Sequence, residues 1–109
     1  MEVQCPFKMT KETKNLFDLT DKVAIITGSS KGIGLAIASA FAEYGAQVVL
    51  SSRSQDAVNG AAKELKQKGY SVTAQACHVG DENQLENLVK KTLEIFGRID
   101  ILVNNAAIN

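Results

Sequence analysis

The sequence is poor in residues that stiffen or crosslink a chain, with one proline, two cysteines and no tryptophan in 109 residues. Cys5 and Cys77 lie far apart, and we expect reduced thiols in an intracellular protein, cytoplasmic by default, with peroxisome and mitochondrion left open. Basic and acidic residues balance to no net charge, which argues against general affinity for nucleic acid. No apolar run approaches the roughly 20 residues that cross a bilayer, so no membrane span is predicted.

What the sequence does contain is the composition of an ordinary folded domain, preceded by a polar segment. Hydrophobic residues make up 45% and charged residues 22%, which argues against disorder. Residues 1–20 lack the arginines of a mitochondrial presequence and the apolar core of a secretory signal. We therefore predict an N-terminal arm over residues 1–20 that docks near Phe17 and Leu19, and one folded unit over residues 21–109.

Short apolar segments alternate with longer amphipathic ones along residues 21–109. The predicted strands are Val23–Thr27, Gln47–Ser51, Ser71–Ala76 and Asp100–Asn104, and the predicted helices are Lys31–Tyr44, Gln55–Lys68 and Glu82–Phe96. Each helix is followed at once by a glycine, the residue that ends a helix most readily in the left-handed conformation. Continuous apolar strands suit a parallel sheet that is covered on both faces. The sequence therefore predicts an α/β fold, a Rossmann-type doubly wound parallel sheet truncated after about four strands, in the order 3-2-1-4.

A glycine-rich segment, Thr27-Gly28-Ser29-Ser30-Lys31-Gly32-Ile33-Gly34, joins the first predicted strand to the first predicted helix. Backbone N–H groups at such a turn can hold a pyrophosphate, and glycine permits both its close approach and a positive φ. The glycine spacing fits neither G-x-G-x-x-G nor the P-loop. We predict a nucleotide-binding turn, with cofactor contacts from Gly28, Ser30, Lys31, Gly32, Ile33 and Gly34.

The turn resembles the Thr-Gly-x-x-x-Gly-Ile-Gly motif of the short-chain dehydrogenase/reductase family, which binds NAD(P). Residues 104–107, Asn-Asn-Ala-Ala, are similar to the Asn-Asn-Ala-Gly motif that follows the fourth strand in that family. The family motif lines the cofactor ribose, so the resemblance implies cofactor contacts by Asn105 and Ala106. The segments Ser-Ser-Arg, Cys-His-Val-Gly and Asn-Ala-Ala-Ile-Asn are similar to those of the NADP-dependent carbonyl reductase and retinol dehydrogenase branch.

The end of the second predicted strand bears on the choice of cofactor. An NAD-binding site calls for a carboxylate there, but the segment Ser51-Ser52-Arg53-Ser54 has none before Asp56. Arg53 can bind a phosphate through two parallel hydrogen bonds, Lys31 can add a second charge, and Ser52 and Ser54 can donate hydroxyl hydrogen bonds. The resemblance gives basic residues at these positions the same meaning, which is NADP(H) in preference to NAD(H).

His78 and Val79 follow the third predicted strand, where many family members carry an Asp-Val pair that contacts the adenine. An imidazole can accept a hydrogen bond from the adenine amino group or stack on the ring. A histidine that merely ends a strand is an equal alternative. A metal-binding role is not expected, because no second ligand lies at suitable spacing.

No residue of this chain is predicted to be catalytic. The family transfers hydride between the nicotinamide and a carbonyl or alcohol, with a serine, a tyrosine and a lysine downstream of Asn-Asn-Ala-Gly. Neither Tyr44 nor Tyr70 forms the Tyr-x-x-x-Lys pattern of that family. We expect the NADP(H)-binding part of such an oxidoreductase, as a fragment or a truncated product. The alternative is a non-catalytic NADP-binding or interaction module, forming a homo-oligomer or pairing with a full-length subunit through an open apolar edge at residues 101–103.

Overall fold

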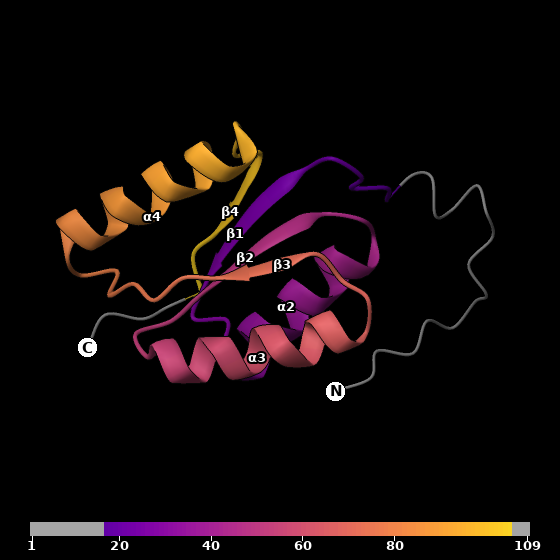
Figure 1. Ribbon diagram of the computed structural model, residues 1–109, viewed down its shortest axis with the longest axis horizontal. Coiled ribbons are helices and arrows are strands. Elements are labelled where there is room, and N and C mark those ends of the chain that lie inside the picture. The colour runs from indigo at the N-terminus through magenta and orange to yellow at the C-terminus, as the bar shows by residue number, and fades with distance from the viewer. Residues whose placement is uncertain (1–16, 106–109) are drawn as a thin grey trace.

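The computed structural model describes residues 17–105, which form a four-stranded parallel sheet in the order β3-β2-β1-β4 (Figure 1). The strands are β1 (Val23–Thr27), β2 (Gln47–Ser51), β3 (Val72–Ala74) and β4 (Ile101–Val103), and the helices are α2 (Gly32–Glu43), α3 (Gln55–Gln67) and α4 (Glu82–Phe96). The predicted fold and strand order are confirmed. The order reverses between β2 and β4, which both pair with β1, so the carboxyl end of β1 lies at the topological switch point.

The two outer strands are shorter than predicted, and β4 covers Ile101–Val103 of the predicted Asp100–Asn104. The predicted strand Ser71–Ala76 ends at Ala74. Beyond it, the Ala76 N–H donates to Gln55 Oε1 over 3.1 Å, and the Cys77 N–H donates to Ser52 O over 2.8 Å. The chain therefore leaves the sheet edge and crosses toward the end of β2.

Successive residues of the central strands face opposite sides of the sheet. Ile26, Val48 and Leu50 pack with buried residues of α2 and α3 in one core cluster. Ile25 and Val49 pack with Cys77 and Leu88 in a second, smaller cluster. Figure 1 shows the same division, with α2 and α3 on one face of the sheet and α4 on the other. Both faces are thus covered, as the apolar strands predicted.

The end of the predicted arm packs on the folded unit. The Leu19 N–H donates to Tyr44 O over 2.8 Å, and the ring of Phe17 lies 6.3 Å from that of Tyr44. Thr20 lies against Gly45, where an added Cβ would be 2.9 Å from the Thr20 hydroxyl. Residues 1–16, including Cys5, lie outside the described residues, and the division of the chain at residue 20 stays a prediction.

The carboxylate of Asp100 fixes the start of β4 against the start of β1. Asp100 Oδ2 accepts from the Val23 N–H over 2.8 Å, and Oδ1 accepts from Arg98 over 2.6 Å. The hydrogen bond from Arg98, followed by the smaller effect of the one from the Val23 N–H, holds the pKa of Asp100 below its ordinary value. The ionised carboxylate therefore stabilises the folded state above the unfolded pKa, and this contribution is lost as pH falls through the folded pKa.

We predict that Asp100→Asn lowers the melting temperature at pH 7, because the Arg98 ion pair and one acceptor for Val23 are lost. The difference between the two proteins should shrink once the pH falls below about 4, where the native carboxylate also protonates. Thermal melts from neutral to acid pH measure this difference. A gap that stays constant over the whole range would contradict the role assigned to Asp100.

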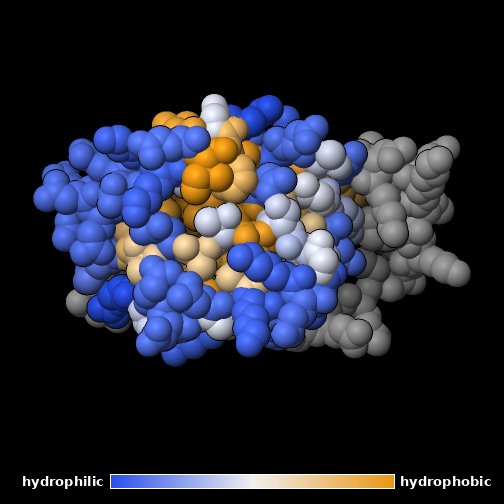
Figure 2. All heavy atoms as spheres, in the orientation of Figure 1, coloured by the Kyte–Doolittle hydropathy of each residue, from blue (hydrophilic) through white to orange (hydrophobic). Residues whose placement is uncertain are grey.

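Apolar surface remains exposed beside α4 and β4. Leu102 shares the sheet face of Ile25, its register partner, but is 60% exposed. Leu93 and Ile95 of α4 are 45% and 61% exposed. Figure 2 shows orange, apolar surface next to the blue, polar surface over α4. Within residues 17–105, no helix has the length and apolar character to cross a membrane.

Candidate functional site: the glycine turn and its pocket

The three glycines of the turn differ in what they permit. Gly28 and Gly32 both have φ +63°, a left-handed conformation that disfavours other residues. A Cβ added at Gly32 would meet no protein atom within 4 Å, so this position faces open space. A Cβ on Gly34 would lie 2.2 Å from Gly28 O and 2.6 Å from Asn105 Nδ2. Gly34 therefore allows α2 to start directly beneath the turn.

The N-terminus of α2 lacks the side-chain cap that the other two helices have. Its N-cap residue, Lys31, accepts no hydrogen bond through its side chain. In contrast, Ser54 caps α3 by accepting from the Ala57 N–H, and Asp81 caps α4 in the same way. The first N–H groups of a helix carry a partial positive charge and need an acceptor. At α2 they are left for a ligand or solvent.

Ser29 ties the turn to the end of β2. Its hydroxyl donates to Ile26 O over 2.7 Å and accepts from the Ser51 N–H over 2.9 Å, while its own N–H donates to Ser51 O. Ser29 and Ser51 are both fully buried, yet Ser51 Oγ has no hydrogen-bond partner in the described part of the chain. This role of Ser29 was not predicted, because the sequence pattern of a glycine turn does not distinguish a buried serine from an exposed one.

These two adjacent serines provide a matched pair of variants. Ser29→Ala leaves a buried N–H and C=O without their partner, and we predict a loss of about 1–3 kcal/mol in the free energy of unfolding. Ser51→Ala removes a hydroxyl that makes no hydrogen bond and is predicted to be neutral or slightly stabilising. Urea denaturation of both variants measures the difference. Equal losses would contradict the assigned hydrogen bonds.

Hydrogen bonds hold the segment after β4 against the same turn. Thr27 Oγ1 accepts from the Asn105 N–H over 3.0 Å, and Asn105 Nδ2 donates to Gly28 O over 3.1 Å. Thr27 Oγ1 also donates to Asn104 Oδ1 over 3.3 Å. The Asn-Asn segment therefore fixes the carbonyl of the first glycine, so the two sequence motifs meet at one place.

A pocket of about 550 Å³ opens over the turn, between the ends of β1 and β2 and the segment after β3. Nine residues predicted to bind cofactor line it, namely Gly28, Ser30, Lys31, Gly32, Ser52, Arg53, His78, Val79 and Asn105. Ser54, expected as a second hydroxyl donor, lines it as well, and so do Ala57 and Cys77, which were not predicted. Ile33 and Gly34 do not, because Ile33 is 72% exposed and Gly34 is buried beneath the turn. Ala106 lies outside the described residues.

The pocket carries positive charge without an internal counter-charge. Neither the Lys31 ammonium nor the Arg53 guanidinium forms an ion pair with a carboxylate among residues 17–105. Both side chains belong to exposed residues, and the uncapped start of α2 lies next to Lys31. The pocket therefore has the chemistry of an anion site, with fixed backbone donors at its base and two cations at its rim.

The loop that follows β3 holds His78 through its ring and its backbone. Its Nδ1 accepts from the Gly80 N–H over 3.0 Å, and the Gln84 side chain accepts from the His78 backbone N–H over 2.9 Å. A neutral ring bonded in this way carries its proton on Nε2, which is then a donor. In this tautomer the ring has no free acceptor nitrogen for an adenine amino group, and contact of His78 with the adenine stays a prediction. The Asp81 N–H in turn donates to His78 O over 2.9 Å.

The thiol of Cys77 lies against this pocket but is nearly inaccessible. Cys77 is 2% exposed, and burial, followed by the charge of Asp81, raises the pKa of its thiol. The thiol is therefore protonated at neutral pH and a poor nucleophile. Over residues 17–105, no three histidine, cysteine or acidic side chains gather as a metal site would require.

Comparison with known proteins gives consistent matches. A family model described as short chain dehydrogenase matches residues 22–109. Dehydrogenase/reductase SDR family member 4 of Oryctolagus cuniculus is 53% identical over 91 residues, which cover 84% of this chain and 35% of that protein. The Homo sapiens protein of the same name is 50% identical, covering 84% and 33%. This chain therefore spans about a third of the length of these curated relatives.

Solved structures agree with the sequence matches. The crystal structure of hydroxysteroid dehydrogenase from Escherichia coli superposes with a TM-score of 0.83 at 42% identity, over 87% of this chain and 40% of that one. A short-chain type dehydrogenase/reductase from Mycobacterium marinum gives 0.82 at 40% identity, over 86% and 38%. In both cases the similarity extends over more than four-fifths of this chain.

Proposed function

The chain belongs to the short-chain dehydrogenase family, and we propose that it is the NADP(H)-binding part of an oxidoreductase acting on a carbonyl or an alcohol. Membership implies a nicotinamide dinucleotide, which supplies or accepts the hydride when bound. The proposal includes a preference for NADP(H) and a carbonyl or an alcohol as the substrate. It also includes similarity to the carbonyl reductase and retinol dehydrogenase branch. The name of the Escherichia coli neighbour, a hydroxysteroid dehydrogenase, fits alcohol or carbonyl chemistry.

The observation that carries the proposal is the uncapped start of α2 beneath an open glycine turn. The diphosphate of the cofactor would bind the N–H groups that follow Lys31, where Gly32 leaves room for its approach. Asn105 supports this geometry indirectly, since its amide fixes the Gly28 carbonyl. The residues present therefore fit a dinucleotide diphosphate.

The proposed preference for NADP(H) rests on the residues after β2. Arg53 and Lys31 line the same pocket, and both lack a carboxylate partner within the described segment. A ribose 2′-phosphate would supply the missing negative charge and could bind Arg53 through two parallel hydrogen bonds. Ser52 also lines the pocket, but its hydroxyl donates to Ser54 O over 3.1 Å, so it must turn to reach a phosphate.

Catalytic groups are proposed to lie in the parts of the relatives that this chain does not span. Tyr44 packs on Phe17 at the opposite end of α2 from the pocket, and Tyr70 packs on the first core cluster. Neither tyrosine lines the pocket. We assign no catalytic residue in residues 17–105, and the intracellular location stays a prediction.

A non-catalytic binding or interaction module is the second candidate, favoured by one observation. β4 pairs with β1 on one side, and within residues 17–105 no strand covers its other side. Leu102, at 60% exposure, lies on this strand. A second copy or a full-length subunit could cover this edge. A product extended beyond residue 109 that oxidises NADPH in the presence of a carbonyl compound would decide against the module.

Calorimetric titration of this chain with NADPH tests the proposal. We expect saturable binding with a Kd above about 1 µM, because the exposed apolar surface at Leu102 implies marginal stability. Absence of binding to a folded chain at about 1 mM would overturn the cofactor assignment. Submicromolar binding by a sharply melting monomer would show that the site is complete without further residues.

A further inference from the structure

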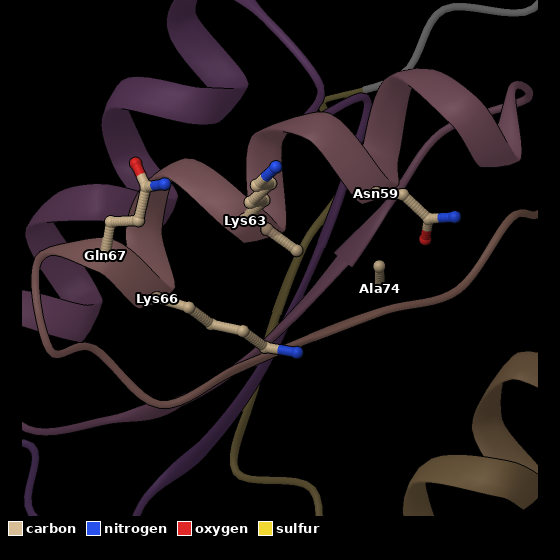
Figure 3. Close-up of a pocket in the computed structure, with 6 residues that line it drawn as sticks. Asn59, Lys63, Lys66, Gln67 and Ala74 are labelled. Carbon is tan, nitrogen blue, oxygen red and sulfur yellow. The ribbon is translucent and has the colours of Figure 1, made fainter.

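A second hollow, of about 510 Å³, lies between α3 and the edge strand β3 (Figure 3). It is lined by Asn59, Ala62, Lys63, Lys66, Gln67 and Ala74. None of these residues lines the pocket at the glycine turn. Ala62 is buried and Ala74 is half-buried, so the floor is apolar, whereas the α3 side chains around it are polar and exposed. The family assignment and the proposed function make no use of this surface.

The outer edge of β3 offers backbone hydrogen-bonding groups beside this hollow. The Val48 N–H donates to Ser71 O, and the Gln75 N–H donates to Leu50 O, so alternate residues of this segment face β2. In a parallel pair, the residues between them point their N–H and C=O groups the other way. Val72 and Ala74 therefore present donors and acceptors outward, where no strand pairs with them within residues 17–105.

The two charged residues that line the hollow are both lysines. Lys63 and Lys66 are three residues apart on α3, and Asn59 lies on the same helix face. Figure 3 shows these side chains leaving the helix around the space next to Ala74. Neither lysine forms an ion pair with a carboxylate in the part of the chain that the structure describes.

We propose that the hollow and the β3 edge together bind an extended acidic segment of a partner protein, which adds to β3 as a further strand. Its backbone would pair with Val72 and Ala74, as in known strand-addition complexes. Successive side chains of a strand alternate between faces, so every second residue of the segment would face α3. Acidic residues at those positions would meet Lys63 and Lys66.

Charge complementarity selects this occupant over a second copy of the chain. Two copies related by a two-fold axis at β3 would bring their lysines toward one another, which is unfavourable. Residues 1–16 of this chain also lack the required charge, since they hold three lysines and two glutamates. An acidic segment from another protein satisfies both the open backbone and the unpaired ammonium groups.

The probe is a short labelled peptide of alternating glutamate and valine, with a second peptide in which lysine replaces each glutamate. We expect the acidic peptide to shift the amide resonances of Val72 and Ala74 in ¹H–¹⁵N spectra. The double variant Lys63→Glu, Lys66→Glu should weaken binding about tenfold, measured by fluorescence anisotropy. The matched control reverses Lys90 and Lys91, which are exposed on α4 across the sheet.

Several results would overturn the proposal. These are no binding of the acidic peptide to folded protein at about 1 mM, equal binding of the basic peptide, and shifts confined to β4. Equal weakening by the α4 control pair would show attraction by overall charge and would also overturn it. Shifts at β3 that depend on protein concentration without peptide would identify a second copy as the occupant. Circular dichroism of each variant confirms that it is folded.

Discussion

Gly34→Ala is expected to lower the free energy of unfolding by about 2–3 kcal/mol, although alanine is the better helix former. The added Cβ would lie 2.2 Å from Gly28 O, a backbone atom that cannot turn aside. Relief requires α2 or the turn to move, which would also displace the N–H groups proposed to bind the diphosphate. Urea denaturation measures the stability loss, and the Kd for NADPH should rise at least about tenfold.

Gly60→Ala is the matched control for Gly34→Ala. Gly60 lies within α3, and a Cβ added there meets no atom within 4 Å. This variant should raise the free energy of unfolding by about 0.5–1 kcal/mol, as expected for removing a glycine from a helix interior. If Gly34→Ala behaved like Gly60→Ala, the contact between α2 and the turn would not be as close as the structure shows.

Arg53→Asp is expected to reduce the ratio of NADPH affinity to NADH affinity by about 100-fold. Loss of charge-assisted hydrogen bonds to the 2′-phosphate costs about 1.5–3 kcal/mol, which weakens NADPH about 10- to 100-fold. The new carboxylate can accept from the free 2′-hydroxyl of NADH, which adds to the change. Calorimetric titrations with both cofactors give the ratio directly.

Lys90→Asp makes the same change of charge on α4, away from the pocket. It should leave the ratio of the two affinities nearly unchanged, because solvent and salt screen an exposed charge that lies away from the pocket. Arg53→Asp with an unchanged ratio would reject the assignment of Arg53 to the 2′-phosphate. The diphosphate site itself would stand in that case, because it rests on the backbone at Gly32.

The order of strands and helices was predictable because several features of the sequence indicate where each element begins and ends. Buried strands read as continuous apolar segments, and the glycines after the helices adopt the left-handed conformation, as Gly97 does with φ +77°. The early end of β3 was not predictable, since the apolar and small residues continue past Ala74. What ends that strand is the Gln55 side chain, which takes the Ala76 N–H from a distant part of the sequence.

The sequence predicted which residues form the site better than it predicted the role of each one. Motif spacing located the turn, but it does not distinguish a glycine that makes room for a ligand from one that makes room for a helix. Gly32 and Gly34 differ in this respect. Likewise, the proton position on His78 depends on a hydrogen bond from Gly80, which only the folded loop brings within reach.

Titration of the chain with NADP⁺, followed by ¹H–¹⁵N spectra, tests most directly whether the open start of α2 receives the diphosphate. We predict that the largest amide shifts fall on residues 28–34 and the first turn of α2, with smaller shifts at Arg53. The account would be contradicted if amide resonances elsewhere shifted while those of residues 28–34 did not. It would also be contradicted if no resonance of a folded chain shifted at about 1 mM NADP⁺.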